Sequence, residues 1–220
     1  MEGEGTVLKI ENRKLKQPSI VIPEGCNRVL LHACCAPCSS AIVEWLLQHE
    51  VRPTIFYYNP NIYPREEYEI RKQESQRHAE SLGVEWIDGD YRHETWLHDV
   101  CGLERTLAPD ERSQNEMAKE PERGRRCERC FRLRLTETAR EAQRLGLRFF
   151  ATTLASSRWK SLEQIERAGR AAEQIVEGTT FWAQNWRKGG LQERRNQLLR
   201  EYNFYNQLYC GCEFSIENPK

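Results

Sequence analysis

Four short apolar runs alternate with longer helix-forming segments, and this alternation constrains the fold more than any other feature. The runs occupy residues 28–33, 52–58, 85–87 and 149–154, and the helix-forming segments occupy residues 39–49, 65–82, 127–145 and 161–177. Strands that alternate with helices along a chain usually pair in parallel within one sheet. The pattern therefore predicts an α/β fold with a mainly parallel sheet, flanking helices and a helical C-terminal region.

The length and charge of the chain fit one such domain. With 220 residues the chain can bury most of a single core, and its formal net charge of zero indicates no global attraction to polyanions. Residues 1–25 are polar and contain Pro18 and Pro23, so we expect an N-terminal arm there and a single catalytic α/β domain over residues 26–215. The N-terminus has no apolar leader, and no apolar run reaches the length of a membrane span. We therefore expect a cytoplasmic protein that does not associate with a membrane.

Nine cysteines, most of them in short motifs, indicate the chemistry of the chain. The motifs are Cys34-Cys35 after the first apolar run, Cys127-x-x-Cys130, and Cys210-Gly-Cys212. An α/β protein that binds nucleotides would place a glycine-rich phosphate loop after its first strand, whereas this chain places thiols there. In the cytoplasm, clustered cysteines are more often metal ligands or redox-active thiols than structural disulfides. Ligands also gather at the carboxyl ends of parallel strands.

Two of the motifs together supply four thiolates, from Cys34, Cys35, Cys127 and Cys130. Adjacent cysteines suit a structural zinc ion poorly, because zinc sites usually space their ligands by two to four residues. A cubane has four separate irons, so adjacent thiolates can each reach a different one. The spacing therefore favours a 4Fe-4S cluster over zinc. The alternative is that Cys34 and Cys35 are buried as small apolar side chains.

Cys38 and the C-terminal pair have separate interpretations. Cys38 lies one helical turn beyond Cys34, where it could ligate a second metal or simply pack. A disulfide between Cys210 and Cys212 would close a small strained ring that is easily reduced, and Gly211 supplies the backbone freedom to form it. We interpret Cys210 and Cys212 as a redox-active pair; the alternative is two ordinary thiols near the C-terminus.

Basic, aromatic and amide side chains near these motifs form a candidate RNA interface. The candidates are Arg125, Arg126, Arg129, Tyr58, Asn59, Tyr63, Arg187 and Lys188. Arginines bind phosphates and aromatic rings stack on unpaired bases, although a run of arginines is more often a solvated face. His32 and Asp99 are candidate proton donors that no motif singles out.

Taken in order, the motifs span most of the chain and resemble the QueH-type epoxyqueuosine reductases. The matching stretches are LHACCAPC at 31–38, YNPNI at 58–62 with Glu67, Tyr68 and Arg71, RCERCF at 126–131, TTL at 152–154 with Ser157 and Lys160, WRK at 186–188 and YCGC at 209–212. The resemblance implies reduction of the epoxide of epoxyqueuosine at the wobble position of a tRNA anticodon. This two-electron reaction is the last step in the formation of queuosine.

The same resemblance implies a fold, cofactors and partners. The fold would be Rossmann-like and related to the adenine nucleotide α-hydrolases (HUP-like). Cys34, Cys35, Cys127 and Cys130 would ligate a 4Fe-4S cluster, and Cys210 and Cys212 would be the redox-active pair. A second, mononuclear iron would lie near Cys38, where some relatives have aspartate. The partners would be tRNA bearing epoxyqueuosine and an unidentified electron donor.

Two other classes of protein remain as alternatives. An ATP-dependent tRNA-modifying enzyme on the same scaffold would carry a Ser-Gly-Gly-x-Asp-Ser phosphate loop after the first strand, which this sequence lacks. A zinc-stabilised tRNA-binding module would not need the adjacent Cys34 and Cys35 or the Cys-Gly-Cys motif.

Overall fold

The computed structural model describes residues 20–104 and 115–216, which form one five-stranded sheet with helices on both faces. The strands are β1 (Arg28–His32), β2 (Arg52–Tyr57), β3 (Glu85–Asp88), β4 (Phe149–Thr152) and β5 (Thr180–Phe181). They lie in the order β3-β2-β1-β4-β5, and every neighbouring pair is parallel. This is the strand order of a Rossmann-type sheet. The predicted α/β fold with a parallel sheet is therefore confirmed.

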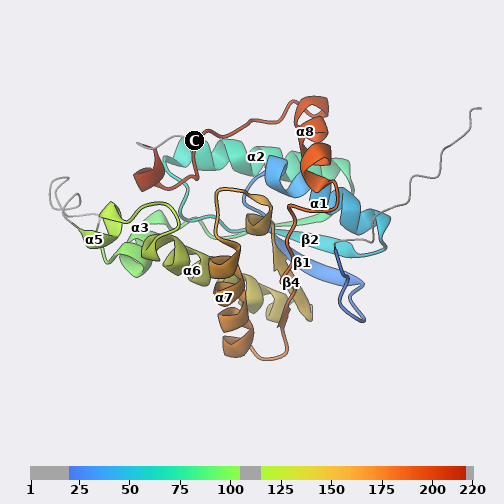
Figure 1. Cartoon of the computed structure of the whole chain (residues 1–220), viewed down its shortest axis with the longest axis horizontal. Coiled ribbons are helices and arrows are strands. Elements are labelled where there is room, and N and C mark those ends of the chain that lie inside the picture. The colour runs from blue at the N-terminus through green and yellow to red at the C-terminus, as the bar shows by residue number, and fades with distance from the viewer. Residues whose placement is uncertain (1–19, 105–114, 217–220) are drawn as a thin grey trace, which may run out of the picture.

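Helices cover both faces of the sheet. The helical segments are α1 (Ala36–Gln48), α2 (Arg65–Ser81), α3 (His93–Trp96), the π-helix η1 (Leu97–Cys101), α5 (Glu116–Lys119), α6 (Arg125–Arg144), the 3-10 helix η2 (Thr153–Ser156), α7 (Leu162–Ile175), α8 (Leu191–Glu201) and the 3-10 helix η3 (Glu213–Ser215). Figure 1 shows α1, α2 and α8 on one side of the sheet and α6 and α7 on the other. The segment after α8 then runs back past α2 toward the C-terminus.

The predicted elements agree with the structure to within a few residues, but strand β5 and the short helical segments α3, η1 and α5 were not predicted. Helix α1 begins at Ala36, earlier than predicted, because Pro37 is tolerated in a first helical turn. Strand β5 was not predicted, since its two residues are too short for a periodic pattern. Helix α8 lies in the C-terminal region that was predicted to be helical. Residues 105–114, part of the stretch without clear periodicity, lie outside the described residues.

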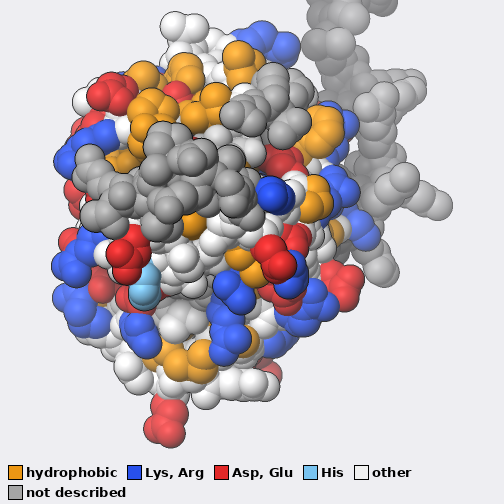
Figure 2. Space-filling model, turned by 90° about the vertical axis from the view of Figure 1, so that its left-hand side faces the viewer, with side chains coloured by type: hydrophobic (Ala, Val, Ile, Leu, Met, Phe, Trp, Pro, Cys, Tyr) orange, Lys and Arg blue, Asp and Glu red, His pale blue; other side chains and the backbone are white. Residues whose placement is uncertain are grey.

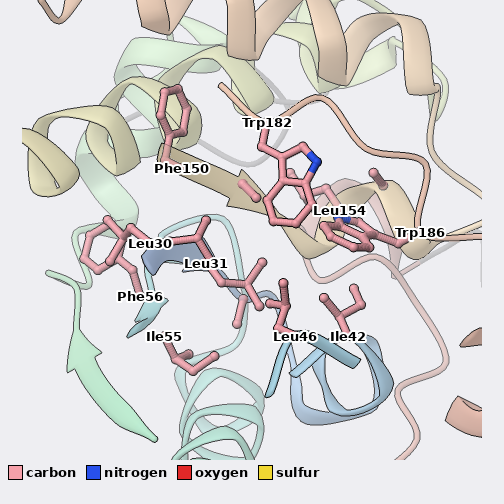
Figure 3. Packing of buried hydrophobic residues seen from close by; sticks show 14 of the residues in the cluster. Leu30, Leu31, Ile42, Leu46, Ile55, Phe56, Phe150, Leu154, Trp182 and Trp186 are labelled. Carbon is pink, nitrogen blue, oxygen red and sulfur yellow. The ribbon is translucent and has the colours of Figure 1, made fainter. Parts of the chain in front are cut away.

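The core joins the central strands to both helical layers. Figure 3 shows Leu30 and Leu31 of β1 packed among side chains from neighbouring strands and from α1. Trp186, in the segment after β5, is also buried, and its Nε1 donates to the carbonyl oxygen of Thr152 at 3.1 Å. Its ring centroid lies 5.3 Å from that of Trp182. The loop that carries Arg187 and Lys188 is therefore anchored in the core beside the carboxyl end of β4.

The predicted N-terminal arm of residues 1–25 lies mostly outside the described residues. Of its last residues, Ile20 is buried in the main core, so the boundary between arm and domain stays a prediction. Among the described residues, no helix has both the length and the apolar character needed to cross a membrane.

The way in which the stability of the fold changes with pH should depend in part on His78. This residue of α2 is buried edge-on against Tyr202 and Phe204, and burial lowers its pKa from 6.5 to about 4. Because the unfolded chain then binds a proton that the folded chain excludes, stability is complete above pH 6.5 and falls as the pH drops toward 4. The slope contributed by one such group is at most about 1.4 kcal/mol per pH unit.

We expect the His78→Phe variant to lose less stability than the wild type between pH 6.5 and pH 4. Denaturant unfolding at several pH values measures this difference. His49→Phe, the same substitution at an exposed position, is the comparison variant. A slope for His78→Phe equal to that of the wild type would contradict the assignment.

Candidate active site

The first cysteine motif lies between the carboxyl end of β1 and the start of α1. Cys35 occupies the N-cap position of α1, and the sulfurs of Cys34, Cys35 and Cys38 all lie within 4.8 Å of one another. The two adjacent sulfurs, of Cys34 and Cys35, are 3.8 Å apart. Thiolates in such a group are suitable ligands for a metal ion. The i, i+4 spacing of Cys34 and Cys38 therefore does bring their thiols together.

Hydrogen bonds and nearby cations favour a negative charge on this group of thiols. The pKa of Cys34 is held well below its ordinary value, because the Cys35 and Cys38 thiols donate to it and Lys160 and Arg134 lie nearby. Burial raises the pKa of Cys35. Cys34 is thus the thiol of this group that loses its proton most readily, and metal binding requires a deprotonated sulfur.

The second motif lies in the first two turns of α6. The backbone N–H of Arg123 donates to the sulfur of Cys127 at 3.3 Å, and Nε1 of Trp96 donates to that of Cys130 at 3.4 Å. Burial raises the pKa of the Cys127 thiol to about 11. Donors directed at sulfur stabilise a bound thiolate and help to set the potential of an iron–sulfur cluster. Both sulfurs therefore have surroundings that suit metal ligation.

The C-terminal motif lies next to the other two. Cys210 lines one cavity with Cys34 and Cys38, and a second cavity with Cys127. Cys212 is buried in an apolar cluster with Cys130 and Trp96, and burial raises its pKa to about 12. The tertiary structure thus brings together three motifs that are spread along the chain from Cys34 to Cys212.

Lys160 connects these motifs. Its Nζ lies 3.3 Å from the sulfur of Cys210, and it lines both cavities that contain Cys210. Burial alone would lower the pKa of this ammonium group, but the Cys210, Cys34 and Cys38 thiolates raise it above its ordinary value. Lys160 therefore stays charged among the thiols.

The cavity lined by Cys34, Cys38 and Cys210, which we call the thiol cavity, is small and rich in cations. Its volume is about 30 Å³, and Arg71, Arg134 and Lys160 line it. Three of its buried polar atoms have no hydrogen-bond partner among the described residues: Oδ1 of Asn61, Nε of Arg134 and Oε1 of Gln207. Thiol donors surrounded by buried positive charge fit an anionic, thiolate-ligated metal cofactor.

Arg71 holds the C-terminal motif in place. It is 3% exposed, and its guanidinium donates to the carbonyl oxygens of Tyr209 at 3.3 Å and Cys210 at 3.2 Å. It also forms an ion pair of 2.6 Å with Glu67, one turn earlier in α2. Gly211 has a φ of +124°, and a Cβ there would lie 3.1 Å from the Arg71 guanidinium. The glycine of the motif is thus required by the turn and by this close approach.

The candidate RNA contacts divide into buried and exposed residues. Arg126 is 2% exposed and donates to the carbonyl oxygens of Met117 and Ala118, both at 2.8 Å, so it is not available to a phosphate. Asn59 is also buried, where its Nδ2 donates to the carbonyl oxygen of Ala33. The expectation that RNA contacts these two side chains directly is not supported, because the fold uses their polar atoms.

The remaining candidates differ in how accessible they are. Arg125 is exposed but forms an ion pair of 2.6 Å with Glu120. Arg187 is half-buried, and its guanidinium holds the backbone carbonyls of residues 157 and 160. Tyr58 is half-buried, whereas Arg129, Tyr63 and Lys188 are exposed. Figure 2 shows basic and acidic side chains interspersed on the face that it presents, rather than a single basic patch.

The two candidate proton donors are not equivalent. His32 is fully buried between Oγ1 of Thr152 at 2.8 Å and the carbonyl oxygen of Tyr58 at 3.1 Å. Burial lowers its pKa to about 3, so it is neutral at physiological pH and acts as a structural link between strands. Asp99 is exposed on η1 beside His98, and it does not line the thiol cavity.

Comparison with known proteins identifies the family. A family model described as epoxyqueuosine reductase QueH matches residues 29–218. The chain belongs to the QueH family. A QueH epoxyqueuosine reductase from Histophilus somni is 38% identical over 96% of this chain and 81% of the relative. Those of Acinetobacter baylyi and Thermotoga maritima are 38% and 35% identical, over 90% and 86% of this chain and 84% and 90% of the relatives.

Membership of the QueH family makes the chain an oxidoreductase, as the motifs predicted. Neither Arg134 nor Gln207 was assigned from the sequence to the lining of the cysteine site. Arg134 falls on the same helical face as Cys127 and Cys130, at i+7 and i+4, so a charged residue on a cysteine-bearing face was its signal. Gln207, whose Nε2 lies 2.9 Å from the sulfur of Cys35, stands in no motif and had no signal.

The Arg71–Glu67 pair should be essential to the position of the C-terminal motif. We expect Arg71→Met to lower the free energy of unfolding by about 3–5 kcal/mol, because it leaves the Glu67 carboxylate buried without its cation. The double variant Glu67→Gln/Arg71→Met should regain part of that loss. Arg65→Met, which removes an exposed ion pair with Glu69, should cost at most about 1 kcal/mol. Chemical denaturation measures all three, and equal losses for Arg71→Met and Arg65→Met would contradict this role.

Proposed function

We propose that this protein reduces epoxyqueuosine at the wobble position of a tRNA anticodon to queuosine. The observation that carries the proposal is the convergence of the three cysteine motifs around Lys160 in a chain of the QueH family. An epoxide that loses its oxygen to give an alkene takes up two electrons and two protons, and the oxygen leaves as water. The site would supply redox-active sulfurs and a half-buried cation, Lys160, for this reaction.

In this proposal Cys34, Cys35, Cys127 and Cys130 would hold a 4Fe-4S cluster, which supplies single electrons at low potential. The donors from Trp96 and the Arg123 backbone would stabilise the ligating thiolates of α6. Cys38 would be a ligand to a second iron, since its sulfur lies within 4.8 Å of both adjacent thiols. The ligands of a cubane bind separate irons, so the two pairs need not be as close as the ligands of one ion.

The chain's own residues would supply electrons, protons and charge. Oxidation of the Cys210 and Cys212 thiols to a disulfide releases two electrons and two protons, which balances the reduction of one epoxide. Lys160, next to Cys210, would stabilise negative charge that develops on the epoxide oxygen. An external electron donor would return the disulfide to the dithiol after each turnover.

The proposed ligands can be tested by single substitutions. We expect Cys127→Ala to lose iron and the visible absorbance of anaerobically purified protein, because a cubane that lacks one thiolate is labile. Cys26→Ala is the control, since Cys26 is a core thiol whose one hydrogen bond among the described residues goes to the carbonyl oxygen of Arg28. Full iron in Cys127→Ala would refute the ligand assignment. A colourless wild type that contains zinc would favour the alternative of a zinc-stabilised RNA-binding module.

The redox pair should be separable from the cofactor. Cys210→Ala and Cys212→Ala are expected to keep the iron content of the wild type but to lose most multiple-turnover reduction, because neither thiol is a proposed ligand. Iron analysis and conversion of epoxyqueuosine in tRNA, followed by nucleoside chromatography, provide the two readouts. If either variant loses its iron, the division of the cysteines into ligands and redox pair is wrong.

A further inference from the structure

A second, larger hollow adjoins the thiol cavity. This groove has a volume of about 510 Å³ and lies between residues 156–159, the first turns of α8 and residues 206–208. It shares Cys38, Ser157 and Gln207 with the thiol cavity, so the two spaces are contiguous at these side chains. A groove of this size fits a ligand of nucleoside dimensions, whereas the thiol cavity of about 30 Å³ is too small for a base.

The groove presents an aromatic ring on a rigid loop. The indole of Trp159 is 49% exposed, and it lines the groove. Each of the five consecutive backbone carbonyls of residues 156–160 accepts a hydrogen bond from a side chain elsewhere in the fold. The donors are Gln192 to residue 156 at 3.0 Å, Arg187 to residues 157 and 160, and Arg123 to residues 158 and 159, both at 3.0 Å. The backbone that carries the ring is thus held in place before any ligand binds.

The groove also carries groups suited to the rest of a nucleotide. Its walls include the amides of Asn196 and Asn206, which can pair with the edges of a base. Arg158 and Arg195 also line it, and neither forms an ion pair with any carboxylate in the described part of the chain. Arg125 on α6 and many other arginines are engaged with glutamates, so these two are better placed to meet phosphates.

We propose that the groove binds the target nucleobase of the RNA substrate, with its ring stacked on Trp159 and its flanking phosphates on Arg158 and Arg195. This inference rests on the proposed function and adds the residues that recognise the base. The base stays in the groove because it is too large for the thiol cavity. Only the epoxide-bearing substituent enters that cavity, past Cys38, to reach Lys160 and Cys210.

The role of Trp159 is tested by measuring how tightly the enzyme binds an anticodon stem-loop RNA that carries epoxyqueuosine. The measurement uses the anaerobic holoenzyme without a reductant, so that the substrate is bound but not converted. We expect Trp159→Ala to raise the dissociation constant roughly 10- to 100-fold, the range of one base–aromatic stack. Trp159→Phe should recover most of the affinity, because a smaller aromatic ring still stacks. Ile175→Ala, which truncates an equally exposed side chain on α7, should have no effect. Iron content, unchanged in all variants, confirms an intact site.

The two arginines are tested by the salt dependence of the same affinity. The Arg158→Gln/Arg195→Gln variant should flatten the log–log slope by about 0.7–0.9 for each phosphate contact that is lost. Arg140→Gln/Arg144→Gln is the charge-matched control, because both arginines are exposed on α6 and pair with Glu137 and Glu141. An unchanged slope would overturn the phosphate contacts.

The outcome separates this inference from the proposed function. If Trp159→Ala binds the RNA as tightly as the wild type, and the wild type reduces epoxyqueuosine, then the groove assignment is wrong and the function stands. If the wild type binds the RNA through Trp159 but reduces no epoxyqueuosine, then the function is wrong and the groove still binds RNA. If the wild type does not bind the epoxyqueuosine-containing RNA at all, both the groove assignment and the proposed function are wrong.

Discussion

The candidate site depends on the pairing of buried positive charge with sulfur and oxygen acceptors. A cation removed from water costs several kcal/mol unless it finds partners, so the position of each buried cation is strongly specified. Lys160 meets the sulfur of Cys210, Arg71 meets the carboxylate of Glu67, and Arg134 donates to Oδ1 of Asn59. Through these contacts the cations hold the loop after β2, helix α2 and the C-terminal segment around a single cavity.

The parallel sheet provides the frame for this arrangement. Strands β1 and β4 are neighbours, so the thiols after β1 and the loop after β4 emerge at the same edge. The first turn of α6 and the Cys-Gly-Cys segment meet them there. The backbone N–H of Tyr63 donates to the carbonyl oxygen of Gly211 at 2.8 Å, which ties the C-terminal segment to the loop after β2. The candidate site at this edge is therefore built from segments that lie far apart in the sequence, from Cys34 to Cys212.

The sizes of the two hollows provide a physical basis for selectivity. A cavity of about 30 Å³ beside Cys34 and Cys210 excludes a base, whereas the groove of about 510 Å³ beside Trp159 accommodates one. The clamped backbone of residues 156–160 lines part of both spaces and gives each a rigid section of wall. Binding energy from the base would then be available to position the reacting substituent.

The local sequence was sufficient to predict most of the secondary structure and the cysteine motifs of the site. The alternation of apolar runs and helical segments predicted four of the five strands, and the short cysteine spacings identified the thiols, because both signals lie within a few residues. Strand β5 escaped because two residues show no period, and its pairing with β4 arises only in the sheet. The burial of Arg126, the donor role of Arg187 and the contact of Gln207 with Cys35 depend on which segments pack together. Tertiary structure alone decided these, since a polar side chain becomes structural or available only when its neighbours are in place.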